Sequence, residues 1–388
     1  MSHELPIHGA IPHCPHFGAC GGCQSQDVAY SAQLQHKQER LQQLLSETVT
    51  QPLPEIVVHS GEPYGYRNRI RLRVERSDDG TLRFGYNVRT TTEFLPITTC
   101  PIAAGILWET AQSLLHAASQ NEDAAAWLSA ARDVEISCDD ALTQVQLTLG
   151  CPPRTSLPRG SFARSLQAVQ QFAPQVVGAS AIAVDPRTGP TGKVFDTFGA
   201  AGISYQVLDE TYWISRGVFF QVNRFLLPTL VELVTGKRGG QLAWDLFCGI
   251  GLFSRVLARS FEKVIGVEAN PVAISSLRSA FARIDKHGRQ HTAVEATALD
   301  YLRKAVMQRE RPSLIVLDPP RAGAGIEACE LLVHLAPREI VYVSCDPATL
   351  ARDLAVLQTR YELAAVHLVD LFPQTAHLET VVVLQRNS

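Results

Sequence analysis

The sequence predicts an α/β protein built from two domains. After residue 215, apolar strand-like segments alternate with amphipathic helical segments, which is typical of a mostly parallel sheet covered by helices. Before residue 215, the chain holds a group of cysteines, one long polar helix, short strands, and loops rich in proline and glycine, which indicates an α+β domain. We therefore expect an N-terminal domain over residues 1–216 and a C-terminal domain over residues 217–388.

The pattern before residue 215 predicts helices at residues 31–46, 101–120 and 160–172, strands at 66–74 and within 134–149, and a loop at 185–199. Leu34, Leu41 and Leu45 follow helical spacing, and we expect their helix to pack on the C-terminal domain.

The second half predicts five strands, at residues 242–247, 263–269, 313–320, 339–345 and 380–385, and a helix at 252–260. Each of the first four strands ends in polar or reactive residues. Because ligands bind at the carboxyl ends of the strands in open α/β sheets, these four groups should meet at one site.

The composition is that of a globular protein. Of the 388 residues, 46% are hydrophobic and 19% charged, and the formal net charge of −3 excludes a surface that is basic throughout, although a local basic groove stays possible. No apolar run is long enough to span a bilayer, and the N-terminus lacks the pattern of a secretory signal. We therefore expect a cytoplasmic protein, in which nine cysteines serve as metal ligands, nucleophiles or small core residues.

The segment DLFCGIG (245–251) lies between a predicted strand and a predicted helix, and Gly249 and Gly251 allow the backbone to turn tightly beside a ligand. The next strand ends at Glu268, whose carboxylate can accept hydrogen bonds from both hydroxyls of a ribose. A dinucleotide would favour a longer glycine motif around its phosphates. S-adenosylmethionine has no phosphate, so this pattern favours that cofactor, with a simple tight turn as the alternative.

The third strand ends in Asp318-Pro319-Pro320-Arg321. The two prolines fix the backbone and leave a rigid loop with open carbonyl groups beside Asp318. Enzymes that methylate amino groups carry an aromatic residue at the position of Arg321, so methylation of an exocyclic amine is not indicated. The alternative is a structural turn in which Asp318 caps the backbone.

Cys345 follows the fourth strand and precedes a predicted helix, a position that lowers the pKa of a thiol. The neighbouring Asp346 acts in the opposite direction, so the net shift stays open. A small buried cysteine is the alternative. A thiolate that adds to C6 of uracil makes C5 nucleophilic towards a methyl sulfonium, and a base must then remove the C5 proton. Glu379, just before the last strand, is the preferred base, and His377 is its rival.

Six segments of the second half together resemble the RNA 5-methyluridine methyltransferase family, in the order found in that family. The resemblance implies a Rossmann-like class I methyltransferase domain with a mixed, mostly parallel sheet, in which Cys345 is the nucleophile and Glu379 the base. It also implies that Gln221, Phe247, Glu268 and Asp318 contact S-adenosylmethionine. The acidic or amide residue often found after the third strand is not evident in AVEATALD (293–300), so no adenine contact is assigned there. The six segments are FFQVN (219–223), DLFCGIG (245–251), GVEANP (266–271), LDPPRAG (317–323), VSCDPATLARDL (343–354) and HLETVVVL (377–384).

Four cysteines of the first half, Cys14, Cys20, Cys23 and Cys100, have the spacing of a site for zinc or for an iron–sulfur cluster, and the spacing alone does not decide between them. The segment CPHFGACGGC (14–23) is similar to that of family members whose central domain holds a [4Fe–4S] cluster, which favours the cluster.

The chain resembles the shorter members that act on 23S ribosomal RNA, without the N-terminal RNA-binding barrel of some relatives. Transfer RNA is the alternative substrate, and a non-catalytic iron–sulfur protein that binds RNA is the alternative function. We expect a monomer without an obligate protein partner.

The segment YRNRIRLR (66–73) places Arg67, Arg69, Arg71 and Arg73 at a period of two, so that all four face the same side of a strand. Such a basic stripe on an acidic protein suits binding to RNA phosphates. The alternative is a solvated strand face whose arginines pair with acidic residues.

Overall fold

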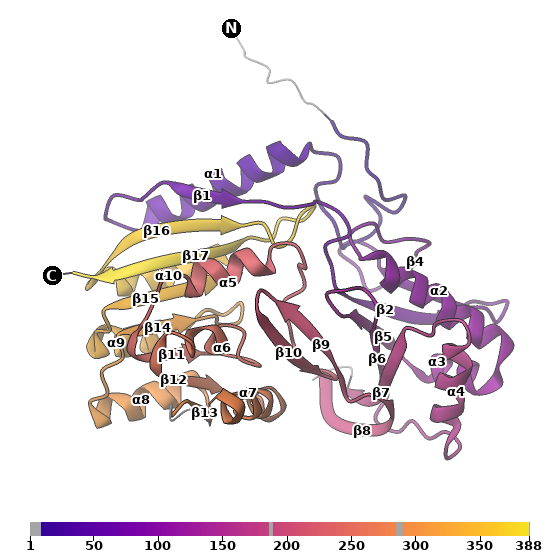
Figure 1. The fold of residues 1–388 in the computed structure, drawn as a ribbon. Helices are drawn as coiled ribbons and strands as arrows, with labels where there is room; N and C mark the ends of the chain where they lie inside the picture. Colours follow the sequence, from indigo (N-terminus) through magenta and orange to yellow (C-terminus); the bar gives the residue numbers. More distant parts are fainter. Residues whose placement is uncertain (1–8, 186–188, 285–289, 388) are drawn as a thin grey trace, which may run out of the picture.

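The computed structural model describes residues 9–185, 189–284 and 290–387. Figure 1 shows two sheets side by side, with the helices of the second half around the larger one. The larger sheet has eight strands in the order β1-β16-β17-β15-β14-β11-β12-β13. These are β1 (Ile56–His59), β11 (Gly240–Leu246), β12 (Phe261–Glu268), β13 (Thr292–Glu295), β14 (Leu314–Leu317), β15 (Glu339–Ser344), β16 (Tyr361–Val369) and β17 (Glu379–Arg386).

All pairs in the eight-stranded sheet are parallel except those of β17, which runs antiparallel to both β15 and β16. The expected mixed, mostly parallel sheet is therefore confirmed. The strand order changes direction at β11, which lies between β14 and β12. Such a switch point opens a crevice at the carboxyl ends of the strands.

Both faces of this sheet are covered, which explains why its strands read as continuous apolar runs. Along β11, Ala243 packs with one core cluster and Trp244 with the other. One face carries α5 (Leu227–Thr235), α6 (Ser254–Leu257) and α7 (Pro271–Ile284), and the other carries α1 (Tyr30–Thr48), α8 (Ala298–Gln308), α9 (Ile326–Leu335) and α10 (Pro347–Leu357).

The first helix and strand belong physically to the eight-stranded sheet, although they precede the other sheet in the sequence. Leu41 and Leu45 of α1 are fully buried in the same core cluster as Trp244. β1 pairs in parallel with β16, with Ile56 opposite Val366. Residues 30–59 thus cross from the N-terminal half of the sequence onto the C-terminal sheet (Figure 1).

The second sheet has seven strands in the order β4-β3-β2-β5-β6-β7-β8, antiparallel except for β6 and β7. The hairpin of β9 (Gly202–Val207) and β10 (Glu210–Ser215) lies between the two sheets in Figure 1. The seven strands are β2 (Arg69–Arg76), β3 (Leu82–Asn87), β4 (Phe94–Pro96), β5 (Asp133–Cys138), β6 (Val145–Cys151), β7 (Val176–Asp185) and β8 (Gly189–Gly199), and the helices are α2 (Gly105–Gln120), α3 (Glu122–Ala130) and α4 (Ser161–Gln170).

The loop expected at residues 185–199 is wrong for its described part. Residues 189–199 form β8, which pairs with β7 through two register shifts. Glycine and proline suggested a loop, whereas bulged pairing on an edge strand accommodates them. The helix expected at 252–260 is confined to the single turn of α6. Within the described residues, no helix is long and apolar enough to cross a membrane.

Candidate active site

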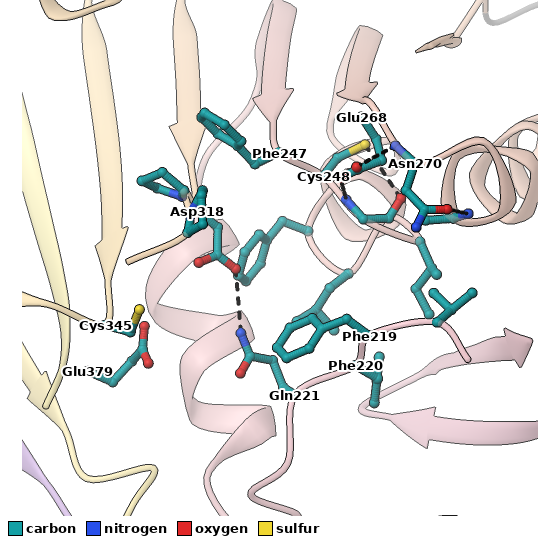
Figure 2. A pocket seen from close by; sticks show the side chains of 18 of the residues that line it. Phe219, Phe220, Gln221, Phe247, Cys248, Glu268, Asn270, Asp318, Cys345 and Glu379 are labelled. Atoms are coloured by element: carbon teal, nitrogen blue, oxygen red, sulfur yellow. Dashed lines mark hydrogen bonds between the residues drawn. The ribbon is translucent and has the colours of Figure 1, made fainter. Parts of the chain in front are cut away.

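A cavity of about 640 Å³ opens at the carboxyl ends of β11, β12, β14 and β15. The predicted convergence of four strand ends is therefore met in the structure. Figure 2 shows side chains from these ends pointing into one space, with Glu268 and Asn270 at one end and Cys345 and Glu379 at the other. The predicted site residues that line it are Gln221, Phe247, Gly249, Glu268, Asp318, Cys345 and Glu379, joined by Arg321 and His377.

The loop after β11 turns sharply and holds a carboxylate in place. Phe247, Gly249 and Gly251 all have positive φ angles, of 63°, 55° and 90°. Gly251 does not line the cavity, and a side chain there would collide with Leu277 of α7, so its role is close packing of the loop. The Gly249 amide donates to one oxygen of Glu268 at 3.0 Å. The second Glu268 oxygen accepts from the Asn270 amide at 2.7 Å, which fixes the carboxylate at the cavity edge (Figure 2).

Asp318 stands between the two ends of the cavity, where the Gln221 side-chain amide donates to it at 3.5 Å (Figure 2). Burial raises the pKa of Asp318 to about 7, and the nearby Asp245 adds to the rise. Burial likewise raises the pKa of Asp245 to about 7, although the Ser254 hydroxyl donates to it at 2.5 Å. Asp318 at the cavity and the fully buried Asp245 near it favour a cationic ligand beside Asp318.

Cys345 and Glu379 meet because β17 runs antiparallel to β15. Ser344 pairs with Thr380, so the residue after the end of β15 lies beside the first residue of β17. Their side chains point towards each other in Figure 2. Cys345 is half-buried, whereas Glu379 is only 3% exposed. The geometry thus places a thiol next to a buried carboxyl group inside one cavity.

The structure indicates the direction in which the pKa of the Cys345 thiol is shifted. Burial raises its pKa to about 11, and the neighbouring Glu379 and Asp318 add to the rise, whereas Arg321 lowers it. Asp346 caps α10 by accepting from two backbone amides at 3.0 Å. The helix start therefore does not dominate, and a thiol with a pKa of about 11 is protonated at neutral pH. Burial and then Asp318 also raise the pKa of Glu379 well above its ordinary value.

His377 lies at the outer rim, two residues before Glu379. It is exposed, and its ring lies 3.4 Å from the Arg321 guanidinium. Partial burial, followed by the charge of Arg321, lowers its pKa. The neutral imidazole therefore keeps a lone pair at neutral pH, but it stands further out than the buried Glu379.

A second cavity, of about 250 Å³, is lined by all four predicted ligands, Cys14, Cys20, Cys23 and Cys100, together with Arg67. The four side chains are free thiols. Burial raises the pKa of Cys100 to about 11. Across the described ranges, no group of three or more His, Cys, Asp or Glu side chains is close enough together to hold a single metal ion.

The four arginines lie on one side of the chain as expected, but their side chains contact other groups of the protein. Along β2, the arginines alternate with the buried Ile70, Leu72 and Val74, as the period of two predicts. Acidic and carbonyl groups hold three of these side chains, as the following contacts show, and phosphate binding by the four arginines stays a prediction. Arg67 lines the cysteine cavity; Arg69 donates to the Val218 carbonyl at 2.9 Å; Arg71 bonds Glu135 at 2.8 Å; and Arg73 bonds Glu75 at 2.7 Å.

Phe219, Phe372 and Asn270 are among the residues that line the cavity but were not singled out from the sequence. Phe219 is 67% exposed at the cavity, and Phe372 packs edge-on against His377. Asn270 holds Glu268 through its backbone and caps α7 through its side chain, which accepts from the Val272 amide at 2.9 Å. Asn270 could have been found from its place directly before a helix, where asparagine is a preferred cap.

A sheet of this order, with a carboxylate-edged cavity at its switch point, defines a class I α/β methyltransferase. Residues 204–387 match the family model described as tRNA (Uracil-5-)-methyltransferase. The chain is 32% identical to an RNA methyltransferase of Nitratidesulfovibrio vulgaris, over 96% of this chain and 82% of the relative. It is 30% identical to the 23S rRNA (uracil(1939)-C(5))-methyltransferase RlmD of Dechloromonas aromatica, over 96% and 85%.

The protein is thus an enzyme of the RNA uracil-C5 methyltransferase family. The fold agrees with that of the solved Pyrococcus abyssi tRNA (uracil-54, C5)-methyltransferase in complex with S-adenosyl-L-homocysteine. That likeness has a TM-score of 0.73 at 24% identity and covers 95% of this chain and 86% of the other.

Proposed function

We propose that this enzyme methylates C5 of a uridine in 23S ribosomal RNA through a covalent adduct between Cys345 and C6, with Glu379 as the base. The observation that carries the proposal is the meeting of a thiol and a buried carboxyl group at one end of a cavity whose other end is edged by Glu268. Ribosomal RNA is favoured by the 23S rRNA enzyme among the relatives. Transfer RNA is the second candidate because the family model and the similar fold carry that name.

S-adenosylmethionine, when bound, supplies an electrophilic methyl group on a sulfonium. We assign its ribose to Glu268 and its cationic centre to the neighbourhood of Asp318, with Phe247, Gly249 and Gln221 around it. The fit rests on the chemistry of these groups. Glu268 presents fixed acceptor oxygens, and a cation beside Asp318 favours the ionised form of a carboxyl group that burial otherwise holds at a pKa of about 7.

The chemistry then assigns one task to each residue. The Cys345 thiol gives its proton to solvent water and its sulfur bonds to C6, while the C5=C6 electron pair moves to C5 and O4. C5 attacks the methyl group, and S-adenosylhomocysteine leaves. Glu379 removes the C5 proton, and the electrons of that C–H bond restore the C5=C6 bond and expel the sulfur. A buried carboxyl group with a raised pKa is a stronger base once ionised than an exposed one.

We further propose that Cys14, Cys20, Cys23 and Cys100 hold a [4Fe–4S] cluster. The four thiols line one cavity of about 250 Å³, and the segment CPHFGACGGC (14–23) resembles that of family members with such a cluster, in which each sulfur binds a different iron. Broad visible absorption after anaerobic purification supports this assignment, whereas a colourless protein with one equivalent of zinc contradicts it.

Two arginines at the rim of the cavity are better placed than the β2 arginines to bind the RNA backbone. Arg321 lies against His377, and Arg40 of α1 donates to the Ala376 carbonyl at 3.2 Å, so two exposed guanidinium groups flank the outer rim of the cavity. Neither forms an ion pair within the described part of the chain. We propose that these groups hold phosphates of the nucleotide whose base enters towards Cys345.

The test uses two variants. Cys345→Ala is expected to abolish methyl transfer while S-adenosylmethionine still binds. Glu379→Gln is expected to accumulate a protein–RNA adduct that survives denaturing electrophoresis, because elimination needs the base. Cys329→Ala, at a buried cysteine of α9 outside the cavity, is the control and should retain activity. Methylation by Cys345→Ala, or no adduct with Glu379→Gln, contradicts the assigned roles, and mapping on 23S and transfer RNA distinguishes the two substrates.

A further inference from the structure

The loop that leads to Glu379 contains a residue in an unfavourable backbone conformation. Gln374, between β16 and β17, has a φ angle of 67° and is only 2% exposed. A non-glycine residue rarely adopts this left-handed region unless its surroundings hold it there. The contacts that hold Gln374 therefore help to determine the path of the chain towards His377 and Glu379.

Gln33 of α1 makes a reciprocal pair with Gln374. The Gln374 amide donates to the Gln33 side-chain oxygen at 3.1 Å, and the Gln33 side-chain nitrogen donates to the Gln374 side-chain oxygen at 3.0 Å. The same nitrogen also lies 2.7 Å from the Ser25 carbonyl and 2.8 Å from the Val28 carbonyl. Gln33 is 4% exposed, so these bonds are shielded from water. One side chain thus ties the loop of Gln374 to the segment that follows Cys23.

The segment that contains Cys14, Cys20 and Cys23 and continues to Ser25, called the cysteine loop below, also contacts the loop of Gln374 directly. The amides of Gln24 and Ser25 donate to the Gln374 carbonyl at 2.9 and 3.2 Å. The Gln24 side chain accepts from the Ala376 amide at 3.3 Å and donates to the Gly21 carbonyl at 2.9 Å. Gln24 follows Cys23 in the chain, and Gly21 follows Cys20. The residues that border two of the four thiols are therefore bonded to the residues that precede His377.

The three carbonyl groups that precede Gln374 in this loop accept hydrogen bonds from side chains of other segments. The cysteine loop is therefore one of several segments that hold the loop of Gln374. Asn223 donates to the Leu371 carbonyl at 3.0 Å, Lys37 to that of Phe372 at 3.0 Å, and Tyr66 to that of Pro373 at 3.1 Å. Among the described residues, the Gln374 carbonyl accepts from the amides of Gln24 and Ser25 alone. Movement of the cysteine loop would release the strained residue while its neighbours stay anchored.

We propose that Gln33 and Gln374 are positioning residues that make the placement of Glu379 depend on the arrangement of the four cysteines. This rests on the proposed role of Glu379 as the base. When the cysteine loop is ordered around its cavity, Gln374 is held in the left-handed conformation and the loop delivers Glu379 beside Cys345. When the cysteine loop is displaced, the amides of Gln24 and Ser25 leave, and the loop of Gln374 relaxes.

The first test compares substitutions at the pair, in full-length protein purified anaerobically. Gln33→Ala removes every side-chain bond of the pair and is expected to lower kcat roughly tenfold, since it leaves buried hydrogen-bonding groups of the loop unpaired. Gln374→Gly keeps the backbone acceptor and tolerates the φ angle, so it should retain more activity than Gln374→Ala. Gln42→Ala, at an exposed position of the same helix, is the matched control and should not change kcat.

The second test measures the local stability of the loop of Gln374 independently of catalysis. Hydrogen exchange at the amides of residues 371–378 should become about tenfold faster in Gln33→Ala and in Cys23→Ala, and the double variant should exchange no faster than either. S-adenosylmethionine binding should stay unchanged, because its assigned groups lie at the other end of the cavity. Unchanged exchange and kcat in Gln33→Ala overturn the proposal even if Cys345→Ala is inactive. Methylation by Cys345→Ala instead overturns the proposed function.

Discussion

The reactivity of Cys345 offers a direct test of the site's electrostatics. Only the thiolate is alkylated, and the pKa of this thiol is raised to about 11. At pH 8, roughly one such thiol in a thousand is ionised, against about one in four for an ordinary cysteine. The greater nucleophilicity of a weakly acidic thiol offsets about tenfold of this difference. We therefore expect iodoacetamide to modify Cys345 about twentyfold more slowly than a free cysteine at pH 8.

The pH dependence of the alkylation rate tests the direction of the pKa shift of Cys345. Because the pKa lies above the assay range, the rate should rise about tenfold for each pH unit from pH 7 to 9, without a plateau. Timed labelling and mass spectrometry of the peptide that contains Cys345 separate it from the eight other cysteines of the chain's nine. Glu379→Gln removes a neighbouring carboxylate that raises the pKa, so it should accelerate labelling at pH 9. A plateau below pH 8 would refute the reasoning, since it would show that the start of α10 outweighs burial.

Three further predictions concern RNA binding and stability. Arg40→Gln and Arg321→Gln should each weaken RNA binding and reduce the slope of log affinity against log salt by about 0.7, the value for one phosphate contact on a single strand; an unchanged slope would remove these residues from the RNA site. Lys37→Met leaves Asp370 buried without its cation and should cost about 3–5 kcal/mol in urea unfolding, and adding Asp370→Asn should restore part of the loss. Gly266→Ala forces a methyl group into a packed contact and should cost about 1–3 kcal/mol by the same measurement; wild-type stability would mean that the neighbouring helix shifts freely.

The sequence predicts the cofactor end of the cavity well because that end depends on local pattern. A strand followed by a glycine turn is visible in DLFCGIG, and the carboxyl ends of parallel strands meet by topology alone. Glu268 and Asp318 therefore fall where their positions in the chain suggest. The reversed direction of β17 is different, since it depends on pairing with β15 and β16, which no local pattern encodes. The neighbourhood of Cys345 and Glu379 could be expected from resemblance, whereas its geometric cause appears only in the structure.

The arginines of β2 show that a correct strand pattern does not reveal the partners of its charged side chains. The alternation predicts the exposed face, and Arg71 and Arg73 do lie on it. Arg71, however, bonds Glu135, which stands opposite it on β5, whereas Arg73 has Asp133 opposite it and bonds Glu75 of its own strand. Cross-strand pairs of opposite charge stabilise a sheet, and the partners lie more than fifty residues away in the chain. A basic stripe in one strand therefore says little about free charge until the adjacent strand is known.

Arg67 has a different place from the three arginines that follow it. Its side chain lines the cysteine cavity, and its Nε has no hydrogen-bond partner among the described residues. Thiols that bind a metal do so as thiolates, so a group held by four of them brings negative charge into this cavity. A guanidinium with a free donor is suited to offset that charge. In the proposed cluster site, Arg67 would supply this compensating charge next to the Cys23–Gln24 segment that bonds the loop of Gln374.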